Sequence, residues 1–176
     1  MFKEINNLKI FFEEPEREFH LREIARILRK NPVTIKRMLE GFVKKNILIL
    51  KKERKFHLYS SNAENIEYKE AKKQYNLNKL SNSGLIDFLK HELNLPTIIV
   101  FGSFARGEDN KNSDVDICII TETKKQLDIE GYEKAINRKI QLHFFNQNEF
   151  KRLKLKNKSL FTNIINGYKI YGLLEI

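Results

Sequence analysis

The sequence predicts an α+β protein with two domains. Apolar residues recur at helical spacing through most of the first 45 residues, and two short strand-like runs follow. Residues 98–145 contain further strand-like runs between polar segments, which predicts a small mixed sheet with flanking helices. We therefore expect domains at residues 1–62 and 83–176, joined by a linker at 63–82. A length of 176 residues accommodates both domains.

The composition indicates a folded cytoplasmic protein with a polyanionic partner. Hydrophobic residues make up 41% of the chain, and no apolar run reaches membrane-spanning length. The single cysteine excludes an internal disulfide and a cysteine-rich metal site. The net charge of +10 is concentrated at one end, since residues 1–60 hold 15 Lys and Arg against 8 Glu. This asymmetry favours nucleic acid as a partner, although a merely solvated basic surface would carry the same charge.

Three helices are predicted in the first 45 residues. The first ends at residues 13–16, which include a proline. The second covers about Leu21–Leu28, where apolar residues recur at i, i+3, i+4 and i+7. The third begins at Asn31, a favourable N-cap, followed by Pro32 at the first helical position. Its expected core residues are Ile35, Leu39, Phe42 and Val43.

A hairpin is predicted after these helices, with strands at 47–50 and 56–59 around a charged turn. A helix pair with a short turn and a basic hairpin resembles the winged helix-turn-helix domains of prokaryotic transcription regulators. The resemblance implies that the third helix faces the DNA major groove and that the hairpin contacts phosphates or the minor groove. The expected DNA-binding residues are Thr34, Lys36, Arg37, Lys51, Lys52, Arg54 and Lys55.

The partner of this N-terminal domain stays open between nucleic acid and protein. Winged helices also serve as protein–protein modules, and a charged helix face is often simply hydrated. The hairpin tip holds four basic residues against one Glu, which favours DNA or another nucleic acid. Because a single winged helix reads few base pairs, a homodimer is expected if a specific site is bound.

The linker and the helix after it are predicted from polarity and spacing. Residues 64–75 can form a connecting helix whose charged side chains lie in water. A second helix, capped by Ser81 or Ser83, then leads into the strand at 98–101.

The most informative motif lies at the end of that strand. The apolar run stops at Gly102 and Ser103, and a second apolar run carries Asp114 and Asp116. Side chains two residues apart on a strand leave the same face, so these carboxylates repel each other unless a cation lies beside them. Gly102 lets the backbone approach a ligand, and Ser103 can open a helix whose N-terminus favours phosphate. Arg106, three residues further on, can also reach a phosphate.

These residues resemble the nucleotidyltransferase superfamily of DNA polymerase beta type, and the minimal nucleotidyltransferases most closely. The family signature is Gly-Ser, ten residues, then Asp-x-Asp, as found from Gly102 to Asp116. The resemblance implies that Gly-Ser binds the triphosphate of an NTP, expected to be ATP, and that Asp114 and Asp116 bind Mg²⁺ or Mn²⁺ for catalysis. The alternative is an ordinary turn followed by solvent-facing aspartates, which would require two coincidences at this spacing. Glu108 and Asp109, between the motifs, are expected to be solvated.

The family's third metal-binding aspartate is missing from the expected strand. That strand covers residues 138–145, and Gln141 stands where the acid is expected. Glutamine is a weaker Mg²⁺ ligand and no general base. His143 on the same face and Glu149 are candidate substitutes, with a half-exposed strand histidine the favoured interpretation of His143. NTP binding is therefore better supported by the sequence than catalysis.

The chain ends with a basic segment and a short strand. Basic residues at 151–158 accompany the apolar faces of one or two helices, and residues 167–172 resemble the family's closing strand. We interpret the basic residues as a solvated helix face, with a nucleic-acid or phosphate-bearing substrate as the alternative.

Two functions from different classes follow from the sequence. The first is a nucleotidyltransferase that moves an NMP from NTP–Mg²⁺ to a hydroxyl acceptor while a winged helix holds it on DNA. The resemblance implies an antibiotic hydroxyl, or a tyrosine of a partner toxin of the HEPN type encoded by a neighbouring gene, as candidate acceptors. The alternative is a DNA-binding transcription regulator whose degenerate transferase domain senses nucleotide, and Gln141 favours it. A scaffold for a neighbouring gene product is a third alternative.

Overall fold

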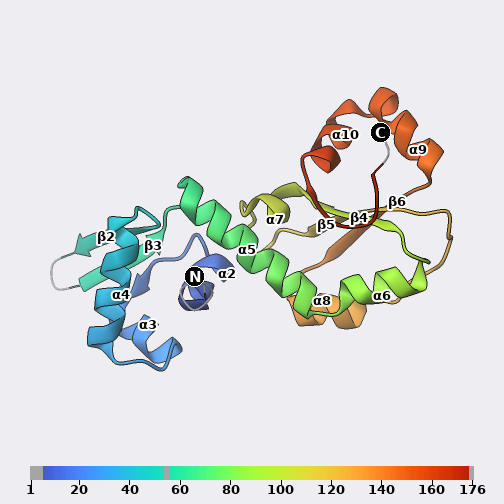
Figure 1. Cartoon of the computed structure of the whole chain (residues 1–176). Coiled ribbons are helices and arrows are strands. Elements are labelled where there is room, and N and C mark those ends of the chain that lie inside the picture. Colours follow the sequence, from blue (N-terminus) through green and yellow to red (C-terminus); the bar gives the residue numbers. More distant parts are fainter. Residues whose placement is uncertain (1–5, 54–55, 175–176) are drawn as a thin grey trace. The chain divides into compact units, whose positions relative to one another are not determined.

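The protein is described by a computed structural model covering residues 6–53 and 56–174. The chain forms two compact units, Met1–Tyr75 and Asn76–Ile176. Figure 1 labels their elements, and helix α5 (Ile66–Asn82) contributes residues to both units. Within the described residues, no helix is both long enough and apolar enough to cross a membrane.

The first unit combines small helices with a three-stranded antiparallel sheet. Its sheet has the strand order β1-β3-β2. The predicted sequence of three helices and a hairpin is confirmed, and the two-residue strand β1 was not expected. In chain order the elements are α2 (Lys9–Glu13), β1 (Phe19–His20), α3 (Leu21–Ile27), α4 (Pro32–Lys44), β2 (Leu48–Glu53) and β3 (Phe56–Ser61).

Local sequence sets the turn between α3 and α4. Arg29 adopts a positive φ of 51°, and the Lys30 N–H donates to the Ala25 carbonyl, which ends α3. The Asn31 side chain then accepts from the Val33 N–H at 2.8 Å, and Pro32 occupies the first position of α4. The predicted cap is therefore present, and the buried face of α4 packs into an aromatic core that includes Phe11 and Phe19.

The second unit is a mixed four-stranded sheet with helices on both faces. The strand order is β6-β5-β4-β7, with β4 antiparallel to β5 and β7, and β5 parallel to β6. Helices α6 and α8 cover one face, and α9 and α10 cover the other (Figure 1). In chain order the elements are α6 (Leu85–Glu92), β4 (Thr97–Phe101), α7 (Gly102–Arg106), β5 (Val115–Ile120), α8 (Glu130–Ile136), β6 (Ile140–Phe145), α9 (Gln147–Lys156), α10 (Lys158–Ile165) and β7 (Tyr168–Tyr171).

The linker differs from its prediction in one respect. Helix α5 is longer than the expected helix and continues to Asn82. Lys72, expected to lie in water with the other charges of this segment, is buried with 1% of its surface exposed. Tyr68, four residues earlier, is also buried, and its hydroxyl donates to the Phe11 carbonyl at 2.8 Å. Helix α5 therefore has a buried face, which the polar composition of the segment does not reveal.

Loss of the α4 cap should destabilise the first unit. We expect Asn31→Ala to lower the free energy of unfolding by about 1 kcal/mol, because the Val33 N–H loses its acceptor. Asn31→Asp is the control, since aspartate caps helices equally well. Urea denaturation followed by circular dichroism measures the difference, and an alanine variant as stable as the unaltered chain would contradict the role of the cap.

Candidate functional site

The site begins where the buried strand β4 turns into α7. Phe101 pairs with Asp116 in the antiparallel register of β4 and β5, so Gly102 follows directly beside that aspartate. Gly102 has a φ of +76°, and a Cβ built on it would collide with Asp116 Oδ2 and lie 3.3 Å from Asp116 Cγ. The backbone bend and the carboxylate are therefore in contact, which requires glycine at this position.

The two aspartates lie at the start of β5. Asp114 immediately precedes the strand, although the sequence placed it within the strand, and Asp116 is the second strand residue. Both side chains are half-buried. Gln141 of β6 pairs with Asp116 in parallel register, and its amide Nε2 donates to Asp114 Oδ2 at 2.6 Å. Gln141 therefore lies opposite Asp116 on the neighbouring strand and donates a hydrogen bond to Asp114.

His143 lies on the same strand face as Gln141. Its Nε2 is 3.4 Å from Asp116 Oδ1, and its ring packs on Phe101 with the centroids 5.2 Å apart. The favoured interpretation, a half-exposed strand histidine, agrees with its partial burial, and its ring is directed at the acidic pair. Cys118, two residues after Asp116 on β5, is fully buried in the core, and burial raises the pKa of its thiol to about 12.

The acidic pair fits a divalent cation that keeps other ligands. Asp114 and Asp116 supply hard carboxylate oxygens, and within the described chain neither has a lysine or arginine partner. Across residues 6–53 and 56–174, however, no group of three or more His, Cys, Asp and Glu side chains is arranged to hold a metal ion. A cation here would therefore depend on water and phosphate for the rest of its shell.

The other two predicted phosphate ligands, Ser103 and Arg106, differ in how they lie relative to the bend. Ser103 lies half-buried in the first turn of α7, next to the bend. Arg106 is exposed, and its Nε donates to Glu108 Oε2 at 2.7 Å, so it must leave that carboxylate before it can reach a phosphate. Glu149, one candidate for the missing acid, instead caps α9 through the backbone N–H of Asn146.

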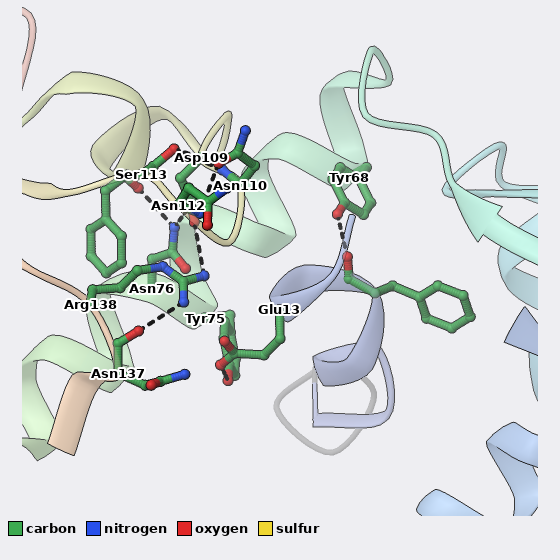
Figure 2. Close-up of polar contacts among 12 residues, drawn as sticks. Glu13, Tyr68, Tyr75, Asn76, Asp109, Asn110, Asn112, Ser113, Asn137 and Arg138 are labelled. Atoms are coloured by element: carbon green, nitrogen blue, oxygen red, sulfur yellow. Dashed lines mark hydrogen bonds and ion pairs between the residues drawn. The ribbon is translucent and has the colours of Figure 1, made fainter. Parts of the chain in front are cut away.

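A buried polar cluster holds the loop between the two motifs. Asp109 was expected to be solvated, but only 2% of its surface is exposed. It accepts from Asn76 Nδ2 at 2.7 Å, and its Oδ2 lies 3.8 Å from Arg138 Nη2 (Figure 2). Arg138 lies two residues before β6, whose Gln141 contacts Asp114. The cluster therefore ties the loop to the strand beside the acidic pair, and charge pattern alone gave no signal for it.

A short turn carries the loop from this cluster to Asp114. The backbone N–H of Asn110 donates to Ser113 Oγ at 3.0 Å, and the Asn112 N–H donates to Asn110 Oδ1 at 3.0 Å. An open cavity of about 380 Å³ adjoins the turn and Asp114. Its walls also include Lys111 and residues of α8 and the β6 start, so it is polar and mixed in charge.

The predicted DNA-binding residues lie on the first unit. Thr34, Lys36 and Arg37 are exposed on α4, and Lys36 Nζ lies 3.9 Å from Glu40 Oε1. Their exposure is what a recognition surface requires, although it does not identify a ligand.

The four predicted DNA-binding residues of the hairpin do not share one environment. Lys51 Nζ lies 2.7 Å from Glu53 Oε1, and this hydrogen bond, together with the charge of Glu18, raises the pKa of Lys51 above its usual value. Lys52 is exposed on β2. Arg54 and Lys55 lie outside the described residues.

Any side chain at Gly102 should separate the bend from Asp116. We expect Gly102→Ala to lower the free energy of unfolding by about 2 kcal/mol through the positive φ and the collision with the carboxylate. Gly131→Ala is the matched control, because Gly131 lies in α8 with no heavy atom within 4 Å of its added Cβ. The control should be neutral or slightly stabilising in thermal denaturation, and equal effects of both changes would contradict the contact.

Removal of the buried Asp109 charge should destabilise the second unit. We expect Asp109→Asn to cost about 3 kcal/mol, because Arg138 is left buried without its carboxylate. Glu108→Gln, on an exposed neighbour, should change stability by less than about 0.5 kcal/mol. The double change Asp109→Leu with Arg138→Met should be more stable than Asp109→Asn in urea denaturation, and a less stable double variant would contradict the pairing.

Comparison with known proteins assigns the second unit to a family. A search of curated proteins finds no match. The family model for polymerase beta nucleotidyltransferases matches residues 83–173, which is 91 of the 176 residues. This match contains the bend, the acidic pair and Gln141, and it supports nucleotidyl transfer as the general activity. The chain belongs to the polymerase beta nucleotidyltransferase family.

Proposed function

We propose that this chain binds an NTP with Mg²⁺ or Mn²⁺ at the bend and the acidic pair, and transfers an NMP to a hydroxyl acceptor. The observation that carries the proposal is the contact between Gly102 and Asp116, because it joins a phosphate seat and a metal ligand in one site. Family membership supports the reaction class. ATP is the proposed nucleotide.

Each residue has a physical role in this reaction. Gly102 leaves the backbone open to phosphate oxygens, and Ser103 offers its hydroxyl and N–H as donors. Asp114 and Asp116 are the proposed metal ligands and catalytic residues, and the Gln141 amide fixes the orientation of Asp114. When bound, the cation supplies charge neutralisation at the phosphates.

The chemical step is an in-line displacement. The acceptor hydroxyl oxygen attacks the α-phosphorus and releases its proton to water, the bond from this phosphorus to the oxygen that bridges to the β-phosphorus breaks, and pyrophosphate leaves. The cavity beside Asp114 is the proposed entry for the acceptor, because Asp114 forms part of its wall. The acceptor is a small hydroxyl compound or a tyrosine of a protein partner.

The first unit is proposed to be a winged helix-turn-helix that holds the chain on DNA. Thr34, Lys36 and Arg37 on α4 would enter the major groove, and Lys52 on β2 would contact phosphate, with Arg54 and Lys55 as further phosphate ligands. Lys51 must exchange Glu53 for phosphate to take part. A homodimer would read a two-fold symmetric site, and a cytoplasmic location follows from such a partner.

A second candidate function is a nucleotide-sensing transcription regulator. Gln141 favours it, because an amide opposite Asp116 stands where the family places a third carboxylate, and this amide donates a hydrogen bond to Asp114. In this function the nucleotide changes the affinity for DNA and is not consumed.

The acidic pair should be essential for transfer. We expect Asp114→Asn and Asp116→Asn to reduce pyrophosphate release from radiolabelled ATP with Mn²⁺ by at least about a hundredfold. Asp87→Asn is the control, since Asp87 lies on α6 and pairs with Lys90 on the surface. If the unaltered chain binds ATP in equilibrium dialysis but releases no pyrophosphate in the presence of candidate acceptors, the sensor is favoured over the transferase.

A third carboxylate should strengthen the metal site. We expect Gln141→Asp to raise the affinity for Mn²⁺ by about tenfold, because a charged hard ligand replaces a neutral amide beside two carboxylates. Gln141→Asn is the control, which keeps the amide and changes the length. Electron paramagnetic resonance of free Mn²⁺ measures the affinity, and an unchanged affinity would show that residue 141 does not face the ion.

A further inference from the structure

The second unit carries a basic surface that its transferase site does not use. We call it the α9 basic surface, and its residues are all exposed: Lys151, Arg152, Lys154, Lys156 and Lys158. From residue 150 to residue 174 the chain has no Asp or Glu. In the described part of the chain, none of the five forms an ion pair. The surface is therefore a run of positive charge without internal compensation.

Lysines elsewhere on the same unit are arranged differently. Lys90 pairs with Asp87, Lys125 with Glu92, and Lys134 with Glu130. These are ordinary surface pairs, in which each positive charge has a carboxylate nearby. The four basic residues of α9 have no ion pair in the described structure and lie close together on one short helix, whereas the lysines of this unit outside the α9 basic surface without a pair, Lys111, Lys124 and Lys169, lie on separate segments.

The arrangement on α9 costs the helix stability. Lys151 and Lys154 are three residues apart and Arg152 and Lys156 are four apart, so like charges neighbour each other on the helix surface and destabilise the helix. Lys154 and Lys156 in the last turn interact favourably with the helix dipole. Lys151 and Arg152 lie further from that end and gain less from it. An external anion would relieve the repulsion.

The position of the helix also matters. Phe150 and Leu153 pack α9 onto the sheet face that carries Phe101 and Cys118, so the basic side chains occupy the outward side. Figure 1 shows α9 and α10 side by side over this face. The site residues Asp116 and His143 belong to the same face, since His143 contacts Phe101. A ligand on α9 would thus be held by the helix layer of the same sheet face that carries Asp116 and His143.

We propose that the α9 basic surface binds the phosphate backbone of a nucleic acid. Four exposed cations on α9 form two neighbouring pairs at about 5–6 Å, and Lys158 follows at the start of α10, so they match successive phosphates better than they match a single anion. The interaction requires neither NTP nor metal and is separate from the proposed DNA contacts of the first unit. It gives this chain a nucleic-acid contact on its transferase unit.

The test compares two variants of the full chain with equal loss of charge. The first changes Lys151, Lys154 and Lys156 to Gln, and the control changes Lys90, Lys125 and Lys134 to Gln. Fluorescence anisotropy with a labelled mixed-sequence single-stranded RNA, at a series of salt concentrations and without nucleotide or metal, gives log Kd against log salt. We expect the slope of the α9 variant to be smaller in magnitude by about 2, because each of the three replaced lysines removes one phosphate contact worth about 0.7. The control variant should keep the slope of the unaltered chain.

Two further measurements complete the test. Thermal denaturation of the α9 variant should show a Tm close to that of the unaltered chain, because the removal of like-charge neighbours offsets the lost interaction of Lys154 and Lys156 with the helix dipole. A Tm that stays close separates lost binding from lost folding. A labelled poly-glutamate peptide probes the other class of acidic partner. The proposal is wrong if both variants lose RNA affinity equally, if neither loses it, or if the α9 changes weaken peptide binding and leave RNA binding intact.

Discussion

The contact between the Gly102 backbone and the Asp116 carboxylate is the constraint on which the site depends. Three features produce it: the buried antiparallel pairing of β4 with β5, which puts Phe101 opposite Asp116, the positive φ of Gly102, and the missing Cβ. The ten residues between Ser103 and Asp114 do not set this distance, because the strand register sets it. The residues proposed as a phosphate seat and as a metal ligand are thereby placed side by side by the backbone alone.

The buried Asn76–Asp109–Arg138 cluster has a geometric role. A buried ion pair is weak evidence for stability, since desolvation of both charges offsets their attraction. Its directional bonds nevertheless fix a loop that would otherwise be free to vary. Because Asp109 precedes Asp114 and Arg138 precedes Gln141, the cluster anchors both chain segments that meet at the acidic pair. The positioning of these two segments, more than any gain in stability, accounts for the buried charges of Asp109 and Arg138.

Local sequence patterns predicted the strands, the bend and the acidic pair. They did not reveal polar pairs between residues that lie far apart in the sequence. Residues 98–101 of β4 and 117–120 of β5 are apolar throughout, so the burial of these strands and the motifs at their ends follow from the sequence. Helix α5 buries Tyr68, Lys72, Asn76 and Leu80 at every fourth position, and two polar members of that stripe conceal its period. Asp109 looked solvated because its partners are 33 and 29 residues away. Helix α8 was missed because Ile136 is its one buried residue among those described.

Gln141 changes the electrostatic character of the site more than its similarity in size to glutamate suggests. A carboxylate beside Asp114 and Asp116 would add a third negative charge and leave all three repelling one another without a cation. The amide donates to Asp114 instead, so the pair is partly satisfied when no ion is present. We expect such a site to bind a cation less tightly and to lose it more readily, so that the phosphates of the proposed nucleotide must supply more of the cation's shell. Occupancy then depends on nucleotide and metal arriving together, a property useful to a transferase that must release its product and to a sensor that must respond to concentration.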